Sequence, residues 1–446
     1  MRDHSSSGRS RGNATHPARI PGVNGFPPRT PDDVDLFDPK TQEDWYPAYD
    51  VLREQAPVWR MPGTRTYVLT RYEDVSLVLR RTDLFGRGGA PDAPARSIPS
   101  RTAAIYREKG WPRTTYLAVE PPEHRKYRDL VDGFFSVTGA ELRRPLITRM
   151  VDELLDPIAE RGTCEFKREF ATPLPVRVIT HMMGFRQEDI PQLKVWSEAW
   201  VLPVRGDITP DEEVYAGEQG VAFQRYIFET MQDKRRQPDD SVISHLVNEA
   251  RFDGQRPLRD EEVICMADHL YIGGNETTTF ALTNAMYLLL SVPGVYETLR
   301  ADPSKVSGFV EEALRMESPT MGLNRVVNAD TEIAGVAIPR GSTVHLRYAA
   351  ANRDQRAFPD PTCLDVDRQN SHRHVAFSMG ETHCPGAGLS RLEQNIAFTT
   401  ILARLADLHF LPGRNDFTHD HNFTLRSMKQ LWIGFAPSAD GRRATG

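Results

Sequence analysis

The sequence predicts a fold made mainly of helices, with a small and separate strand component. Apolar residues recur at helical spacing through most of residues 119–317 and again over about 386–406. Segments of strand length lie near residues 58–70 and 336–346, and residues 423–435 have the pattern of a β-hairpin. The sequence contains no internal repeat. We therefore expect a long succession of helices with short strands on either side of it.

The first part of the chain is expected to mix short elements. The apolar spacing indicates a helix over residues 45–53, strands over 58–60 and 67–70, and a helix over 72–79. Residues 85–117 are rich in Gly, Pro, Arg and Ser and are predicted to form a long loop. A structureless loop of this length in a compact domain often has a functional role.

The helical part is expected to follow with only short breaks. Its stripes of apolar residues cover 122–135, 140–160, 174–183, 187–200, 211–235, 240–250, 260–291, 293–300 and 304–317. Strands are then expected over 336–339 and 343–346. An irregular stretch rich in Pro, Asp and Arg over 352–375 precedes the final helix.

Length and charge restrict the class of protein. A chain of 446 residues with 39% hydrophobic and 26% charged residues is ordinary globular material, in two domains or one large one. We expect a single domain over residues 31–440, preceded by an N-terminal tail over 1–30 that is disordered or has a targeting role. A net charge of −6 argues against a nucleic-acid partner. No apolar run reaches the roughly 18–20 residues of a membrane helix, so a soluble cytoplasmic protein is expected.

One of the four cysteines has unusual neighbours. The cysteines are scattered without CxxC pairing, which indicates neither a zinc site nor a disulfide framework. Cys384, however, comes directly before Pro385, a residue that suits the first position of a helix. A helix start would favour the thiolate form of Cys384. The small residues from Gly386 onwards would let a flat ring lie close to the backbone. His383 could be a second metal ligand, but a neighbour on extended backbone points the other way.

The segment around Cys384 resembles the haem-binding loop of the cytochrome P450 family in its pattern Phe377-x-x-Gly380-x-x-x-Cys384-x-Gly386. The resemblance implies that Cys384 is the axial ligand of the iron of haem b, and that Phe377 and Gly386 lie beside this cofactor. A thiolate ligand favours cleavage of the O–O bond. Two positions depart from the family pattern. Ser378 stands where a glycine is usual, and Thr382 stands where a His or Arg usually binds a haem propionate, so Thr382 can offer only a neutral hydrogen bond.

The long helix expected over 260–291 contains Gly273 and Gly274, which each cost a helix interior roughly 1 kcal/mol. Either close packing between helices or the approach of another group to the backbone would explain them. The segment resembles the distal helix of the same family. The resemblance places Gly273 and Gly274 beside the cofactor, and it makes Glu276 and Thr277 the catalytic acid–alcohol pair that delivers protons to dioxygen.

Several charged residues match other parts of the family. Glu312 and Arg315 share one helix face and could be an exposed surface pair, but the resemblance implies a buried structural network with Arg368. Two further residues, His124 and Arg128, also share a helix face. By themselves they could form a solvated basic surface. The resemblance implies that these two residues and Arg325 bind the haem propionates.

The resemblance extends from about Trp45 to Phe435 and implies a lipophilic small-molecule substrate. By family position, substrate would contact the regions 85–117 and 196–204 and also Tyr271, Thr320, Met321, Leu323, Phe423 and Thr424. Apolar side chains with a few hydroxyls suit such a molecule.

Three functions are weighed for this chain. The leading one is a haem-thiolate monooxygenase that uses dioxygen to hydroxylate or epoxidise its substrate. The same scaffold could instead catalyse oxidative coupling or dehydrogenation. A carrier or gas sensor without turnover is the third reading, but it would need no proton relay. Since no flavin or iron–sulfur motif is present, electrons are expected from a ferredoxin and an NAD(P)H-dependent ferredoxin reductase.

Overall fold

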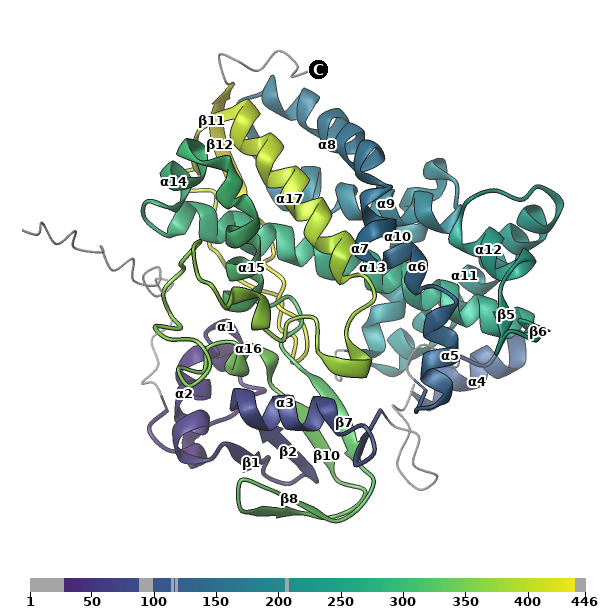
Figure 1. Cartoon of the computed structure of the whole chain (residues 1–446), viewed down its shortest axis with the longest axis horizontal. Coiled ribbons are helices and arrows are strands. Elements are labelled where there is room, and N and C mark those ends of the chain that lie inside the picture. The colour runs from purple at the N-terminus through teal and green to yellow at the C-terminus, as the bar shows by residue number, and fades with distance from the viewer. Residues whose placement is uncertain (1–27, 88–98, 114–115, 117–118, 205–207, 438–446) are drawn as a thin grey trace, which may run out of the picture.

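The computed structural model describes residues 28–437, except 88–98, 114–115, 117–118 and 205–207. Its largest sheet joins the N-terminal segment to strands that come much later in the chain (Figure 1). The order across this sheet is β1 (Val58–Arg60), β2 (Thr66–Leu69), β10 (Thr343–Leu346), β7 (Leu323–Val327) and β3 (Phe85–Gly86). Strands β2 and β10 are parallel, and the other neighbours are antiparallel.

Most of the described residues are helical, as the apolar spacing predicts. The first helices, α1 (Pro39–Glu43), α2 (Tyr46–Gln55) and α3 (Tyr72–Arg80), lie beside the large sheet (Figure 1). The helical part contains α4 (Ser100–Lys109), α5 (Glu123–Asp129), α6 (Asp132–Phe135), α7 (Val137–Glu141), α8 (Arg144–Ala159), α9 (Pro173–Met183), α10 (Ile190–Val201), α11 (Pro210–Arg236), α12 (Val242–Asn248), α13 (Asp260–Ser291), α14 (Val295–Ala301), α15 (Val306–Met316) and α17 (Ala387–Arg404). The short α16 (Tyr348–Ala351) follows β10.

The predicted hairpin over residues 423–435 is wrong. Residues 423–431 are irregular, and β12 (Trp432–Pro437) pairs with β11 (Leu405–Phe410) and β4 (Thr163–Glu165) in a second sheet. These partners are distant in sequence, so local alternation could not reveal them. Two small hairpins, β5–β6 (Arg251–Phe252 and Arg256–Pro257) and β8–β9 (Thr331–Ile333 and Val336–Ile338), complete the strands of the described part.

Part of the predicted loop over 85–117 is a helix. Helix α4 packs along α11, where the Thr102 hydroxyl donates a hydrogen bond to the Glu213 carbonyl at 2.7 Å. A Cβ atom at Gly220 would overlap the Tyr106 ring, so the glycine lets the two helices approach closely. Tertiary packing therefore stabilises a segment whose composition favours a loop. The rest of this prediction falls mainly on residues 88–98, which lie outside the described residues.

Helix α13 has the predicted bounds and is anchored at its first turn. The buried carboxylate of Glu262 accepts hydrogen bonds from the backbone N–H of Arg259 and from the guanidinium of Arg256, each at 2.8 Å. The hydroxyl of Tyr127 donates to the same carboxylate at 2.7 Å. Burial alone would raise the pKa of Glu262, but these hydrogen bonds lower it to about 2. The cluster fixes α5, which carries Tyr127, against α13.

A buried ionic network connects α15 to the segment that leads into the Cys384 region. The Glu312 carboxylate accepts bidentate hydrogen bonds from Arg315 at 2.6 and 2.8 Å and one from Arg368 at 3.0 Å. Both arginines also donate to backbone carbonyls between Pro359 and Cys363. Glu312 and Arg315 have no exposed surface. The two arginines thus share one carboxylate and direct their remaining N–H groups to carbonyls, and the network has the buried position that the family resemblance implies.

No single helix of the described residues is long and apolar enough to cross a membrane. Helices α13 and α14 pass that test only as a pair, which is bent by 99°.

We predict that Glu312→Gln destabilises the protein by about 3–5 kcal/mol, because it leaves two buried arginines without their anion. Burial raises the pKa of Glu312, but Arg315 and Arg368 lower it further, so the net shift is downward. The stabilisation is consequently present above the pKa of an ordinary carboxyl group and is lost as the pH falls through the lowered value. Chemical denaturation followed by circular dichroism at several pH values measures both effects.

Glu141→Gln is the matched control, because Glu141 pairs with Arg144 at the same spacing but on the surface. We expect no measurable loss of stability from this control. Equal losses in the two variants would contradict a special role for the buried network.

Candidate active site

The loop that carries Cys384 is fixed by its own backbone. The backbone N–H of Cys384 donates to the Phe377 carbonyl at 2.8 Å, and the intervening residues form a tight turn. Ser378 and Gly380 both adopt left-handed backbone conformations, with φ of 62° and 65°. Helix α17 begins at Ala387 with Gly386 as its N-cap, so Pro385 lies before the helix rather than at its first position. Cys384 is thus held just before the N-terminal end of α17.

The electrostatic environment of Cys384 only partly agrees with the sequence prediction. Burial raises the pKa of the Cys384 thiol. The backbone N–H groups of Gly386 and Ala387 and the charges of Arg128 and Arg391 oppose this effect, as expected at a helix start, but they do not outweigh it. The helix start therefore lowers the pKa of Cys384 as predicted, but burial raises it by more. A bound cation would have to supply the remaining stabilisation, as it does for coordinating thiols in general.

The two departures from the family pattern contact each other. The hydroxyl groups of Ser378 and Thr382 lie 3.1 Å apart, and both side chains are buried. Ser378 occupies a left-handed conformation that favours glycine, which explains why a glycine is usual at this position. The contact between the hydroxyls gives this less suitable residue a structural role. Thr382 also accepts a hydrogen bond from Arg325 at 3.2 Å.

The residues expected to bind carboxylates gather beside this loop. Arg325 on β7 reaches Thr382, while Arg128 on α5 donates to the His383 carbonyl at 2.9 Å and to Asp132 at 2.8 Å. His124, also on α5, is almost fully buried, and its Nδ1 atom has no hydrogen-bond partner among the described residues. Burial and then the charge of Arg87 lower the pKa of His124 to about 4, so it is neutral at pH 7. The arrangement is not the solvated basic surface considered from the sequence.

The predicted acid–alcohol pair lies on α13. The Thr277 hydroxyl donates to the Gly273 carbonyl at 3.0 Å. The Glu276 carboxylate contacts Nζ of Lys194 on α10 and lies 3.5 Å from the Ser197 hydroxyl. Glu276 is therefore held by an ion pair that sequence reasoning missed. One turn of α13 thus holds both predicted groups, and α10 orients the acid.

The side chains that Gly273 and Gly274 of α13 lack would have different surroundings. A Cβ atom at Gly273 would meet no heavy atom within 4 Å, so this residue borders open space. A Cβ at Gly274 would lie only 2.9 Å from the side chain of Ile179 on α9. Both explanations weighed from the sequence thus apply, one to each residue. The position of Gly274 beside the cofactor stays a prediction, and helix packing gives the absence of its side chain a separate reason.

Helices α13 and α17 meet close to these sites. The Thr278 hydroxyl donates to the Ser390 hydroxyl at 3.2 Å, which joins the residue after Thr277 to the first turn of α17. The acid–alcohol pair and Cys384 therefore lie on segments that are in direct contact.

Three of the predicted substrate residues have other roles. Tyr271 is fully buried against Phe185 and Phe223, with ring centroids 5.5 and 5.7 Å away, so it belongs to the core. Met321 is also fully buried, in the cluster around α2. The ring of Phe423 packs against the His345 ring at 4.5 Å. These three side chains pack against residues that are distant in sequence, so the local sequence pattern could not predict their contacts.

The other predicted substrate residues keep partial exposure. Thr320, Leu323 and Thr424 are all partly buried, and Thr320 forms an isolated β-bridge with Leu425. Of the region expected near 196–204, Trp196 packs against Phe223 and Tyr226.

A second ion cluster supports the proximal side of the site. Arg391 on α17 donates to Glu311 on α15 at 2.5 and 3.1 Å, and its guanidinium lies 4.7 Å from the centre of the Phe377 ring. Burial raises the pKa of Glu311, but His374 and Arg391 more than offset this and lower it to about 2. Sequence reasoning missed this pair, although Glu311 directly precedes Glu312.

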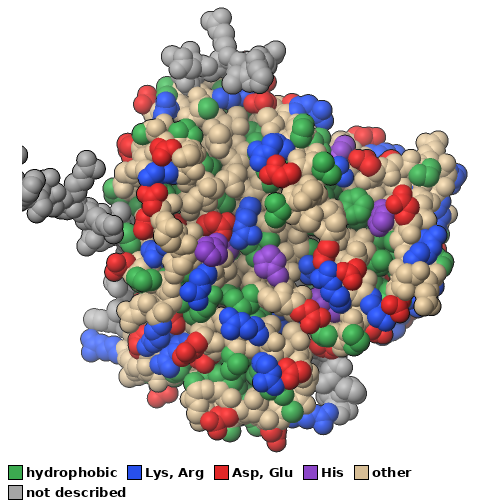
Figure 2. All heavy atoms as spheres, in the orientation of Figure 1, with side chains coloured by type: hydrophobic (Ala, Val, Ile, Leu, Met, Phe, Trp, Pro, Cys, Tyr) green, Lys and Arg blue, Asp and Glu red, His purple; other side chains and the backbone are tan. Residues whose placement is uncertain are grey.

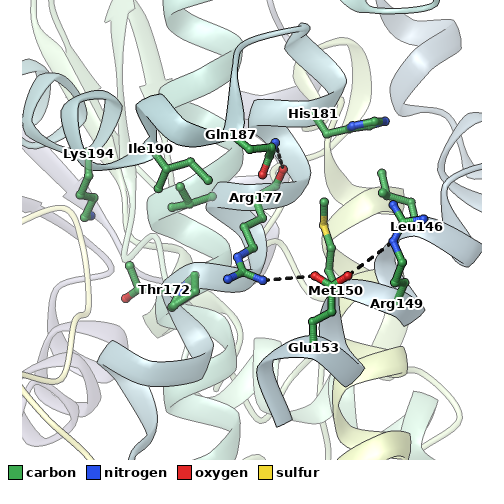
Figure 3. Close-up of a pocket in the computed structure, with 12 residues that line it drawn as sticks. Leu146, Arg149, Met150, Glu153, Thr172, Arg177, His181, Gln187, Ile190 and Lys194 are labelled. Carbon is green, nitrogen blue, oxygen red and sulfur yellow. Dashed lines mark hydrogen bonds and ion pairs between the residues drawn. The ribbon is translucent and has the colours of Figure 1, made fainter. Parts of the chain in front are cut away.

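A surface pocket of about 590 Å³ lies between α8, α9 and α10 (Figure 3). It is lined by Leu146, Arg149, Met150, Glu153, Thr172, Pro173, Val176, Arg177, His181, Gln187, Ile190 and Lys194. The lining contains none of the predicted catalytic or cofactor residues, so this pocket is not the reaction site. Lys194, which lines this pocket, is also the ion-pair partner of Glu276.

We predict that Gly274→Ala destabilises the protein by about 1–3 kcal/mol, because the new methyl group meets Ile179 in a packed interface. Gly273→Ala is the matched control on the same helix turn. It meets no protein atom within 4 Å and should be better tolerated. Denaturant unfolding followed by circular dichroism compares the two variants. A larger loss for Gly273→Ala would contradict the assignment of Gly274 to helix packing.

The described residues fit a flat ring that carries two carboxylates. Gly273 borders open space, Cys384 is partly accessible, and His124 presents a buried nitrogen without a hydrogen-bond partner among the described residues. The buried guanidinium groups of Arg128 and Arg325 both donate to the cysteine loop, at His383 and Thr382. This donor set suits a ligand that is bound through sulfur on one side and through its anionic edge on the other.

Comparisons with known proteins agree with this geometry. The family model described as Cytochrome P450 matches residues 221–431. The chain is 33% identical over 374 residues to "Putative cytochrome P450 YjiB" of Bacillus subtilis, a match that covers 82% of this chain and 90% of the relative. It is 34% identical over 409 residues to "Cytochrome P450 107B1" of Saccharopolyspora erythraea, with 90% and 97% covered.

Solved structures show the same fold. A crystal structure of P450BioI, in complex with hexadec-9Z-enoic acid ligated acyl carrier protein, superposes with a TM-score of 0.80 at 29% identity. The match covers 89% of this chain and 99% of that chain. The helix-rich fold with small sheets that the sequence predicts is therefore confirmed. The chain belongs to the cytochrome P450 family, as a haem b-dependent monooxygenase.

Proposed function

We propose that this cytochrome P450 inserts one oxygen atom from dioxygen into a lipophilic small molecule, by hydroxylation or epoxidation. The observation that carries the proposal is the placement of Glu276 and Thr277 one turn from Gly273, which borders open space. Haem b, when bound, supplies the iron centre at which dioxygen is reduced and its O–O bond is cleaved. The protein supplies orientation, charge and protons.

The haem would be held from two sides. We propose that Cys384 Sγ ligates the iron and that His124, Arg128, Arg325 and Thr382 face the propionates. Burial of Arg325 supports the role, because a buried cation needs an anion nearby and Arg325 pairs with no carboxylate among the described residues. Phe377, whose carbonyl fixes Cys384, and Gly386, the N-cap of α17, would line the thiolate side.

A proton path to the open space is built from neighbouring side chains. Lys194 lines the surface pocket (Figure 3). Its Nζ atom also contacts the Glu276 carboxylate. Glu276 can therefore exchange protons with solvent when its ion pair with Lys194 opens. The Thr277 hydroxyl, which donates to the Gly273 carbonyl, can in turn hold a water or a reacting oxygen beside α13. We propose that Glu276 moves protons and that Thr277 positions their acceptor.

The substrate is proposed to be a medium-sized lipophilic molecule. Relatives carry names that fit this class: "Vitamin D(3) 25-hydroxylase" of Pseudonocardia autotrophica is 32% identical over 408 residues. A structure of CYP109E1 from Bacillus megaterium contains testosterone, at 26% identity and a TM-score of 0.78. A panel of vitamin D3, testosterone and hexadec-9Z-enoic acid can be tested by the change in haem spin state on binding. The partly exposed Thr320, Leu323 and Thr424 are our proposed contacts.

Oxidative coupling or dehydrogenation remains the alternative on the same scaffold. Labelled dioxygen separates the two, since only insertion leaves one labelled oxygen atom in the product. Electrons are proposed to come from a ferredoxin and an NAD(P)H-dependent ferredoxin reductase. On the face shown in Figure 2, basic and acidic side chains alternate.

We predict that Thr277→Ala uncouples electron consumption from product formation, because the hydroxyl that positions the proton acceptor is lost. With a compound from the panel that shifts the spin state, product formed per NAD(P)H should fall about tenfold or more, and peroxide should rise. Thr277→Ser keeps a hydroxyl and is the matched control, so its coupling should stay near that of the unchanged enzyme. Unchanged coupling in Thr277→Ala would remove Thr277 from the mechanism.

A further inference from the structure

The propionate side of the site has fewer available cations than its residues suggest. Thr382 is neutral, and His124 is also neutral at pH 7 because burial and the nearby Arg87 lower its pKa. Arg128 already donates to the Asp132 carboxylate at 2.8 Å. Among the predicted cationic partners, Arg325 therefore differs from Arg128, because it pairs with no carboxylate of the described residues. Haem b carries two carboxylates, so a further cation would improve the charge balance.

Arg87 brings its guanidinium to this place from a distant part of the sequence. It follows β3, which pairs with the strand that carries Arg325. Its Nη1 atom lies 3.3 Å from Nε2 of His124, and its Nη2 atom donates to the Thr382 carbonyl at 3.4 Å. The guanidinium thus touches two of the residues expected to face the propionates, one from α5 and one from the cysteine loop.

The backbone of Arg87 is also positioned for this role. Its N–H donates to the carboxylate of Glu120, just before α5. A Cβ atom at Gly86 would come within 2.6 Å of that carboxylate, so the glycine is needed for the contact. Glu120 therefore holds the start of the Arg87 side chain next to α5, which carries His124.

We propose that Arg87 is a haem propionate-binding residue that supplies the cation missing at Thr382. A guanidinium can bind a carboxylate through two parallel hydrogen bonds, which neither a threonine nor a neutral histidine can do. The small Thr382 leaves room for the longer side chain that arrives from β3, and its carbonyl orients that side chain. In this proposal Arg87 binds the propionate, while Thr382 and Ser378 hold the loop that orients Arg87.

The test measures haem retention directly. Holoprotein reconstituted with haem b is mixed with excess apomyoglobin, and haem transfer is followed by absorbance. Arg87→Ala should lose haem b about tenfold faster than the unchanged protein, the factor expected for one charge-assisted hydrogen bond. Arg87→Lys keeps the charge and should lie between the two. Arg81→Ala is the matched control, because Arg81 makes an exposed ion pair with Asp83 in the same segment.

A second cofactor separates propionate binding from a structural role. In haem b dimethyl ester the propionate charges are removed, so Arg87→Ala and the unchanged protein should lose this ester at the same rate. Arg87→Ala/Thr382→Arg should recover much of the retention of haem b. Equal retention of haem b in all variants, or equally faster loss of haem b and ester from Arg87→Ala, would overturn the proposal. The proposal rests on haem binding alone, so a failure of coupling in Thr277→Ala or of monooxygenation leaves this result readable.

Discussion

The structure depends on the compensation of buried charge around one loop. Glu312 lies at the centre of this requirement, because its carboxylate binds Arg315 and Arg368 where none of the three can reach water freely. The same arginines hold the backbone carbonyls of the segment before the cysteine loop. The loop can present Cys384 in one orientation only because the segment behind it is fixed in this way.

The same requirement explains the opposite side of the loop. Three arginines from β7, α5 and the segment after β3 donate hydrogen bonds to Thr382 or His383. Asp132 pairs with one of them, Arg128, so the cluster keeps an excess of positive charge that favours an anionic ligand. A cofactor with two carboxylates and an iron ion that stabilises a thiolate resolves both problems together. These unfavourable features of the protein without cofactor are expected to be relieved when the cofactor binds. The left-handed backbone of Ser378 lies in the same loop.

The sequence was sufficient for long periodic helices and for the cysteine loop. The bounds of α13 agree with the prediction because its apolar pattern is long and Glu262 caps its start. Prediction failed where distant packing decides the outcome. Helix α4 packs against α11, and β12 pairs with strands from other parts of the chain. Tyr271 packs in a buried aromatic cluster.

The residues proposed for the site can be named from the sequence, but their charge environment cannot. Neither Lys194 nor Arg87 belongs to a motif, so only the folded chain shows that they reach Glu276 and His124. The thiol of Cys384 was expected to be acidic from the helix start, yet burial dominates its pKa. The position of a residue at a helix start can be read from the local sequence. The loss of solvent around its side chain depends on all the residues that pack against it in the fold.

The most direct test of the account is the absorbance spectrum of the reduced, CO-bound protein and of Cys384→Ala. The account predicts a band at the position typical of thiolate-ligated haem in the unchanged protein, and its loss in the variant. Cys363→Ala, which changes another partly accessible cysteine, should keep the band. A spectrum typical of histidine ligation in the unchanged protein, or an unaltered thiolate band in Cys384→Ala, would contradict the assignment of Cys384 as the iron ligand.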